Sequence, residues 1–190
     1  QINGIDYLEV GCKSSEYLLA INNVKNYNIY CADFFEFYKM HTVKYDYIVS
    51  FGVVEHFDPP GKVIKVFGNY LKDTGVLITT CPNTGGSSMS IQKYFDKQVY
   101  NNHLKFNLND LIRYHEESGY KILHASYTGF FSFNNLVFSN FSLAGRFVKI
   151  GLKFINAPIV WFFYLIKKYL KINIQSKSLS SNMIVIAKKK

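Results

Sequence analysis

The sequence is poor in cysteine, and its three cysteines are badly placed for cross-links or metal binding. Because Cys12, Cys31 and Cys81 are odd in number, they cannot all pair in disulfides. No two of them form a Cys-x-x-Cys pair, and no histidine lies at a spacing that would complete a zinc site. The sequence therefore predicts reduced, mostly buried thiols, no metal site and a cytoplasmic protein.

Acidic residues are missing from the C-terminal part of the chain. All 13 Asp and Glu residues lie at or before Glu117, whereas 11 of the 22 Lys and Arg residues follow it. The part up to Glu117 carries a net charge of −2 and the remainder carries +11, which gives the total of +9. A cationic segment of this kind fits a polyanionic partner, such as a phosphate-bearing substrate, an anionic membrane or nucleic acid, or simply a solvated surface.

Uninterrupted apolar runs long enough to cross a membrane are missing too. The longest aromatic run, residues 157–166, has ten apolar residues, whereas a transmembrane helix needs about 20. Lysines flank this run on both sides: Lys149, Lys153, Lys167, Lys168 and Lys171. We expect residues 149–171 to contact an anionic membrane at its surface. A lid over the substrate, a homodimer contact and packing in the core are the alternatives.

The residues that are present describe a folded α/β protein. The apolar content of 48% and the aromatic content of 17% favour one folded domain with a substantial core. Three apolar runs stop abruptly at small or polar residues: Tyr7 to Cys12, Tyr45 to His56 and Gly75 to Asn83. Such runs are typical of buried parallel strands, and ligands bind at the carboxyl ends of parallel strands.

Strand and helix signals alternate along the chain. We predict helices starting near Glu16 and near Pro60, and a third over 110–118 with Asn109 as its cap and Gly119 after its end. His115 would face solvent on this third helix. This alternation predicts a doubly wound, mostly parallel sheet with helices on both faces. The predicted strands are 5–10, 28–31, 45–50, 76–80, 120–127 and 183–187.

An ordered set of motifs resembles one enzyme family. The motifs are Glu9-Val10-Gly11-Cys12, Asp33-Phe34, Tyr45 to Ser50, Glu55-His56-Phe57 and Tyr70 to Asn83. Over residues 5–127 this set resembles the class I S-adenosylmethionine (SAM)-dependent methyltransferases, most of all their small-molecule and glycan-modifying branch. The resemblance implies a Rossmann-like fold, SAM as cofactor and S-adenosylhomocysteine as product.

The resemblance also implies an organisation of the chain. Residues 1–127 would form the SAM-binding core, residues 128–180 an aromatic and basic helical insertion, and residues 181–190 the last strand and tail of the core. The family has a further strand and helix between the Gly11 loop and the strand that ends at Asp33. Tyr7 to Asp33 has room for a single βαβ crossover, so we expect residues to be missing near 22–25.

By resemblance, two groups of residues bind the cofactor. Glu9, Gly11 and Cys12 belong to the first loop, in which Lys13 replaces the family's second glycine. Asp33 and Phe34 complete this first group: Asp33 would accept a hydrogen bond from the adenine amino group, and Phe34 would flank the ring. The second group, Ser50, Phe51 and Gly52, would line the methionine arm.

His56 and His103 are the candidate catalytic residues, because the neutral-range pKa of histidine suits a general base for a hydroxyl acceptor. The reaction that the resemblance implies is methyl transfer to a small molecule, in particular a sugar of a surface polysaccharide or of its lipid-linked precursor. A catalytically degenerate binding domain and an isoprenoid or quinone methyltransferase are the alternatives. A nucleic-acid methyltransferase is disfavoured, because no Asn/Asp-Pro-Pro-Tyr-type loop follows the central strand. The expected location is the cytoplasm, with peripheral contact at the inner membrane face.

Overall fold

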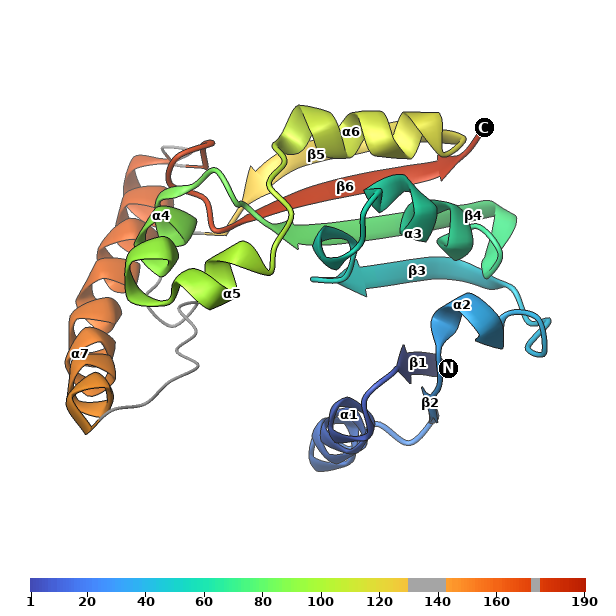
Figure 1. The fold of residues 1–190 in the computed structure, drawn as a ribbon, viewed down its shortest axis with the longest axis horizontal. Helices are drawn as coiled ribbons and strands as arrows, with labels where there is room; N and C mark the ends of the chain where they lie inside the picture. Colours follow the sequence, from blue (N-terminus) through green and yellow to red (C-terminus); the bar gives the residue numbers. More distant parts are fainter. Residues whose placement is uncertain (130–142, 172–174) are drawn as a thin grey trace. The chain divides into compact units, whose positions relative to one another are not determined.

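The computed structural model describes residues 1–129, 143–171 and 175–190, which form two compact units (Figure 1). The N-terminal unit comprises residues 1–44 and the C-terminal unit residues 45–190. Each unit contains its own β-sheet. The residues expected to bind cofactor are therefore divided between two folding units, and each set is described within its own unit.

The N-terminal unit is a single βαβ crossover. Strands β1 (Ile2–Asp6) and β2 (Tyr27–Cys31) pair in parallel, with Ile2 opposite Tyr27 and Asp6 opposite Cys31. Helix α1 (Glu9–Ile21) connects them, and the short helix α2 (Phe34–Phe37) follows β2. The strand over 28–31 is thus confirmed.

The prediction of a first strand over 5–10 is wrong, because β1 ends at Asp6 and α1 begins at Glu9. A short apolar run fits a helix as well as a strand. Here the Leu8 amide donates a hydrogen bond to Asp6 Oδ1 at 2.8 Å, which ends the extended segment. An ion pair between Glu9 and Lys13, with N and O 2.6 Å apart, then supports the first turn of the helix.

The C-terminal unit contains a mixed four-stranded sheet in the order β3-β4-β6-β5. Its strands are β3 (Tyr45–Phe51), β4 (Leu71–Pro82), β5 (Tyr120–Thr128) and β6 (Asn182–Lys189). Strand β3 runs parallel to β4, whereas β6 lies antiparallel between β4 and β5. The last predicted strand is therefore confirmed, and the sheet recruits it from the end of the chain.

Strand β4 starts earlier than the sequence predicts. Asp73-Thr74-Gly75 was expected to be the turn before a strand over 76–80, but these residues lie inside β4. They form an irregularity, since Tyr45 pairs with Leu71 whereas Tyr47 pairs with Val76. The extra residues of β4 are absorbed there, and regular pairing resumes at Val76.

Helices α3 (Pro60–Phe67) and α6 (Leu108–Glu117) pack together over one face of this sheet (Figure 1). Pro60 occupies the first turn of α3, where its missing N–H costs nothing. The core beneath these helices is apolar: Val63, Ile64, Leu77, Leu111, Tyr120, Met183 and Val185 are all buried. On β3, by contrast, the alternating side chains of Tyr47, Val49 and Phe51 are exposed.

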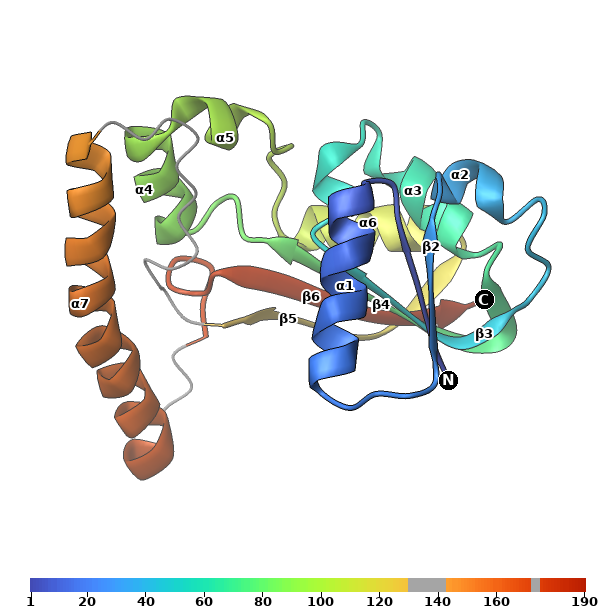
Figure 2. The same cartoon turned by 90° about the horizontal axis from the view of Figure 1, so that it is seen from below.

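The remaining helical segments follow β3, β4 and β5. Helices α4 (Ser87–Phe95) and α5 (Lys97–Asn101) come directly after the carboxyl end of β4, and a short 3-10 turn, η1 (Val54–His56), follows β3. Helix α7 (Leu143–Leu165) runs unbroken in Figures 1 and 2 and continues into a π-helical turn, η3 (Ile166–Leu170). The predicted insertion thus contains a helix over 143–170, whereas its described residues 128–129 and 175–180 are not helical; residues 130–142 and 172–174 lie outside the described residues.

Candidate functional site

Three of the residues predicted to bind the cofactor lie at the carboxyl end of β3. Ser50 is buried, and its hydroxyl has no hydrogen-bond partner among the described residues. Phe51 is exposed, and Gly52 has a φ of +62°, a conformation that glycine adopts without strain. A Cβ at Gly52 would lie 3.2 Å from Glu55 Oε1, so the close approach of this carboxyl group also favours glycine.

Glu55 is the centre of the site. Its side chain is only 1% exposed, and its Oε2 atom has no hydrogen-bond partner among the residues described. Burial raises the pKa of the neighbouring Cys81 thiol, and the charge of Glu55 raises it further. A buried carboxyl oxygen without a partner is costly in a folded protein. We therefore interpret Glu55 as a group that interacts with a ligand or with a charged histidine.

His56 and His103 lie beside Glu55 and face each other. Their ring centroids are 4.9 Å apart, and His56 Nε2 lies 4.0 Å from Glu55 Oε1. The backbone also joins the two segments, because the Leu104 amide donates to the Glu55 carbonyl at 2.9 Å. The two histidines are 47 positions apart in sequence but occupy one site.

The hydrogen bonding of His103 fixes its tautomer. His103 Nδ1 lies 2.8 Å from the Val99 carbonyl oxygen. A carbonyl only accepts, so Nδ1 must carry the proton, and Nε2 of the neutral ring keeps its lone pair. This arrangement suits a general base, because the Nδ1 hydrogen bond also holds the ring in place.

A cavity of about 300 Å³ lies beside His103. Its polar walls come from three places: Asn83 after β4, Ser88 and Gln92 on α4, and Ser181 and Asn182 at the start of β6. The Ser88 hydroxyl is buried without a partner among the described residues. The cavity therefore offers amide and hydroxyl groups to a polar ligand next to a candidate base.

The sequence did not single out the polar side chains of this cavity. Asn83 is buried and donates through Nδ2 to the carbonyls of Lys177 and Ser180, at 2.7 and 2.9 Å. It thereby ties the end of β4 to the segment before β6. The Gly/Ser-rich stretch after Pro82 was the only signal for this region. Its pairing with residues 177–182 depends on strand order, which local sequence does not report.

In the N-terminal unit, the first-loop residues lie on α1 rather than in a loop. Glu9 is exposed and paired with Lys13, and Gly11 sits so close to Asp6 that a Cβ there would collide with the Asp6 carboxyl group. Cys12 is buried, and burial together with Cys31 raises the pKa of its thiol to about 11. The close packing of Gly11 explains a glycine here without any ligand.

Asp33 caps α2. Its Oδ1 atom accepts a hydrogen bond from the Phe35 amide at 2.8 Å, and the Phe34 and Phe35 rings stack at 4.4 Å. Both residues follow the carboxyl end of β2, as predicted. The cap engages one carboxylate oxygen, so recognition of an adenine amine by Asp33 stays a prediction.

Glu55, His56 and His103 also form the one group of possible metal ligands found in the part of the chain that is described, with donor atoms within 4.8 Å of one another. Two imidazoles and a carboxyl group suit a transition metal. Bonds of about 2.1 Å require donors no more than about 4.2 Å apart, so the cluster would have to contract. The prediction that the protein has no metal site stays untested.

Strand β6 is inserted antiparallel in the sheet, and a polar edge lies beside β3 and β4. These features define a class of protein, the α/β methyltransferases with a Rossmann-like fold. Residues 1–125 match the methyltransferase domain family, so the chain belongs to that family. It is a SAM-dependent methyltransferase, as the motifs indicated. A search of curated protein sequences found no match.

Solved structures confirm the fold. A SAM-dependent methyltransferase from Archaeoglobus fulgidus is 20% identical, with a TM-score of 0.58, and the match covers 98% of this chain and 75% of that one. A putative sarcosine dimethylglycine methyltransferase from Galdieria sulphuraria is 19% identical, with a TM-score of 0.59 and coverages of 100% and 70%. PKMT2 from Rickettsia typhi, in complex with AdoHcy, is 9% identical, with a TM-score of 0.53. That match covers 99% of this chain but 44% of PKMT2.

The C-terminal unit fits the methionine end of SAM. Ser50, whose buried hydroxyl has no hydrogen-bond partner in the described part of the chain, and the left-handed Gly52 lie at the carboxyl end of β3, where a ligand can approach the backbone closely. When bound, SAM supplies an activated methyl group. The residues of this unit would hold it through Ser50, Phe51 and Gly52.

Proposed function

We propose that this methyltransferase modifies a hydroxyl group of a sugar, as part of a surface polysaccharide or its precursor. The observation that carries the proposal is the cavity beside His103, whose lining of apolar side chains includes several amide and hydroxyl groups. Sugars present many hydroxyls, and amide and hydroxyl side chains are suited to bind them. The Ser88 hydroxyl in this wall, which has no hydrogen-bond partner among the described residues, supports such a ligand, because a sugar hydroxyl would satisfy it.

In this proposal His103 is the general base. Its Nε2 atom takes the proton of the acceptor hydroxyl while Nδ1–H remains bonded to the Val99 carbonyl. The resulting imidazolium is stabilised by the buried Glu55 carboxyl group, and His56 completes the cluster. Placement of the hydroxyl in line with the methyl group supplies most of the rate enhancement. The base adds a further enhancement to it.

The test is methyl transfer from labelled SAM to a panel of free and nucleotide-linked sugars, with the methylated position read by mass spectrometry. His103→Asn should lower kcat by about 10²–10⁴-fold. Ser88→Ala should raise KM with little change in kcat, because it removes a binding contact only. His124→Gln, at an exposed position on β5, is the matched control.

Two outcomes contradict the proposal. If no sugar is methylated while SAM binds, measured by calorimetry, the acceptor class is wrong. If His103→Asn retains the kcat of the unchanged chain, His103 is not the base.

An apolar groove favours a second acceptor class. The groove, about 590 Å³, is lined by Ile91 on α4 and by Pro158, Ile159 and Phe162 on α7. It suits the hydrocarbon tail of an isoprenoid or quinone. Methylation of a prenylated phenol or quinol, lost in Ile91→Asp and retained in Ser88→Ala, would favour this class over a sugar.

A further inference from the structure

Helix α7 exposes its apolar side. Ile150, Phe154 and Trp161 follow one another at intervals of four and seven residues, which places them on one face of the helix. Their side chains are 52%, 78% and 65% exposed. Asn156, a polar residue, is buried instead. A surface helix of a globular protein has the opposite arrangement, with its apolar stripe against the core.

The apolar surface is long as well as exposed. Residues Ile150–Leu170 have a mean hydropathy of 1.4 in their most apolar window, of which only 6% is buried. By length and composition alone, this is the one helix in the described ranges that would suffice to cross a membrane, although core helices of soluble proteins pass the same test. Exposed apolar surface of this extent marks a site of interaction with a membrane or another protein.

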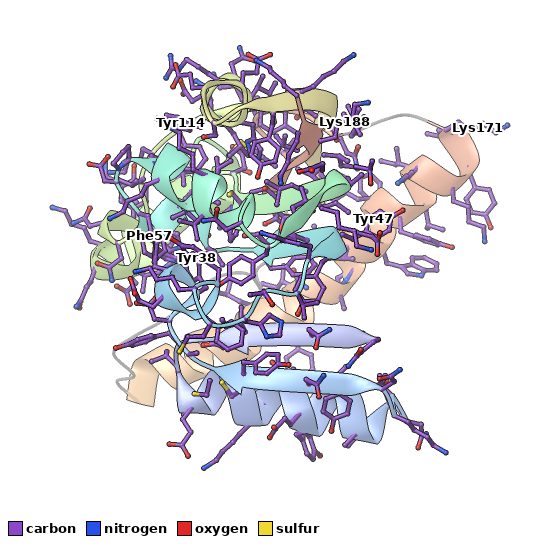
Figure 3. The ribbon with its side chains drawn as sticks, turned by 90° about the vertical axis from the view of Figure 1, so that its right-hand side faces the viewer. Tyr38, Tyr47, Phe57, Tyr114, Lys171 and Lys188 are labelled. Atoms are coloured by element: carbon purple, nitrogen blue, oxygen red, sulfur yellow. The ribbon has the colours of Figure 1, made fainter. Side chains whose placement is uncertain are left out.

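Positive charge gathers at the end of this surface. Lys167 and Lys168 lie on η3, and Lys171 follows its last residue (Figure 3 labels Lys171). The Lys168 ammonium lies 5.7 Å from the Tyr164 ring centroid and 5.4 Å from that of Tyr169. No acidic residue follows Glu117 in the sequence, and residues 118–190 carry a net charge of +11.

From this combination we infer that α7 and η3 bind the surface of a bilayer that contains anionic lipids. The apolar face enters the boundary between headgroups and acyl chains, Trp161 and Tyr164 lie at headgroup level, and the lysines contact lipid phosphates. Lys149 and Lys153, whose side chains lie outside the described ones, are further lysines of the helix by sequence. The 13 residues between Lys153 and Lys167 span about 20 Å of helix, less than the roughly 30 Å of a bilayer's hydrocarbon core, which favours a helix that lies in the surface over one that crosses it. The inference is independent of the acceptor proposed above.

Trp161 gives a direct measurement, because it is the only tryptophan in the chain. The full chain is mixed with vesicles of phosphatidylcholine that contain 30% phosphatidylglycerol, and separately with vesicles of phosphatidylcholine alone. The anionic lipid gives the first vesicles a negative surface potential. We expect flotation with the anionic vesicles, a blue shift of the Trp161 emission, and quenching by brominated lipid.

Charge-matched variants locate the contact. Lys167→Glu/Lys168→Glu should weaken binding to the anionic vesicles by about tenfold or more. Lys97→Glu/Lys121→Glu changes the net charge by the same amount at exposed positions on α5 and β5 and should leave binding close to that of the unchanged chain. Phe154→Ser should weaken binding while circular dichroism confirms the fold and Trp161 remains as the probe.

Three results would overturn the inference. One is failure to float with anionic vesicles. Another is flotation without any change in Trp161 emission, which would place the contact elsewhere. The third is a concentration-dependent dimer in the absence of lipid with Trp161 already blue-shifted, because a second copy of the chain would then cover the face.

Discussion

His115 shows how one side chain links the core to the solution conditions. It lies fully buried between α6 and β4, with Nδ1 donating to the Leu111 carbonyl at 2.8 Å and Nε2 accepting from Thr79 Oγ1 at 3.0 Å. The prediction that it faces solvent is wrong. The helix carries it inward because Leu111, one turn earlier on the same face, is also part of the core.

Burial lowers the pKa of His115 from 6.5 to about 4, and the bond to Leu111 offsets only part of this effect. The unfolded chain therefore binds a proton at a higher pH than the folded chain does. The stability that neutral His115 contributes is complete above pH 6.5 and is lost as the pH falls toward 4. The loss amounts to about 3 kcal/mol at most.

Urea unfolding at pH 7.5, 6, 5 and 4 measures this dependence. His115→Leu should be less stable at pH 7.5, because the Thr79 hydroxyl loses its partner, but should lose less stability on acidification. His124→Gln, at the exposed histidine of β5, is the control and should follow the unchanged chain. An equal slope in His115→Leu and in the unchanged chain would show that another group governs the pH dependence.

At the scale of elements, the start of α6 is set by a reciprocal cap. Asn107 Oδ1 accepts from the amides of Asn109 and Asp110 at 2.8 and 3.2 Å, and Asp110 Oδ2 accepts from the Asn107 amide at 3.0 Å. The sequence prediction placed the cap at Asn109, two residues late. Asn107 and Asn109 are the same residue type, so the choice between them depends on where the preceding loop enters the helix.

This difference gives a paired prediction. Asn107→Ala should lower the free energy of unfolding by about 1 kcal/mol, because amides of the first turn lose their acceptor. Asn109→Ala should change it by no more than a few tenths, since alanine is the better helix former at an interior position. Thermal unfolding of both variants checks this. Equal destabilisation by the two changes would assign the cap to neither residue alone.

At the scale of the whole molecule, the two units differ in the number of strands and in the size of the buried core that stabilise them. The N-terminal unit contains two strands, and a two-stranded sheet is marginally stable by itself. The C-terminal unit contains four strands with a buried apolar core. We therefore expect local opening to occur first in the N-terminal unit.

Hydrogen exchange measures this difference directly. Amides of β1 and β2 should exchange at least about a hundredfold faster than those of β4 and β6, which corresponds to about 2.7 kcal/mol between local and global opening. Saturating SAM should slow exchange of the amides around Ser50 and Gly52, at the carboxyl end of β3. Equal protection of β1 and β4 without ligand would show that the units open together.

Local sequence was sufficient where one residue type leaves little choice. Pro60 marked the start of α3, Gly119, with a φ of +90°, followed α6, and the apolar residues of β3 and β6 indicated strands. It was insufficient at Tyr7 to Val10, where an apolar run became the start of a helix. It was insufficient again at Asp73-Thr74-Gly75, where turn-forming residues were taken into a strand by pairing with β3.

The sequence by itself determined the methyltransferase family, the alternation of strands and helices, and the two candidate histidines. These depend on residue types and on spacing along the chain, which the sequence states directly. Only the tertiary structure brought His103 to Glu55, turned His115 inward and left the apolar side of α7 exposed. Each of these depends on which distant segments pack together, and that is decided by the shared burial of side chains rather than by neighbours in sequence.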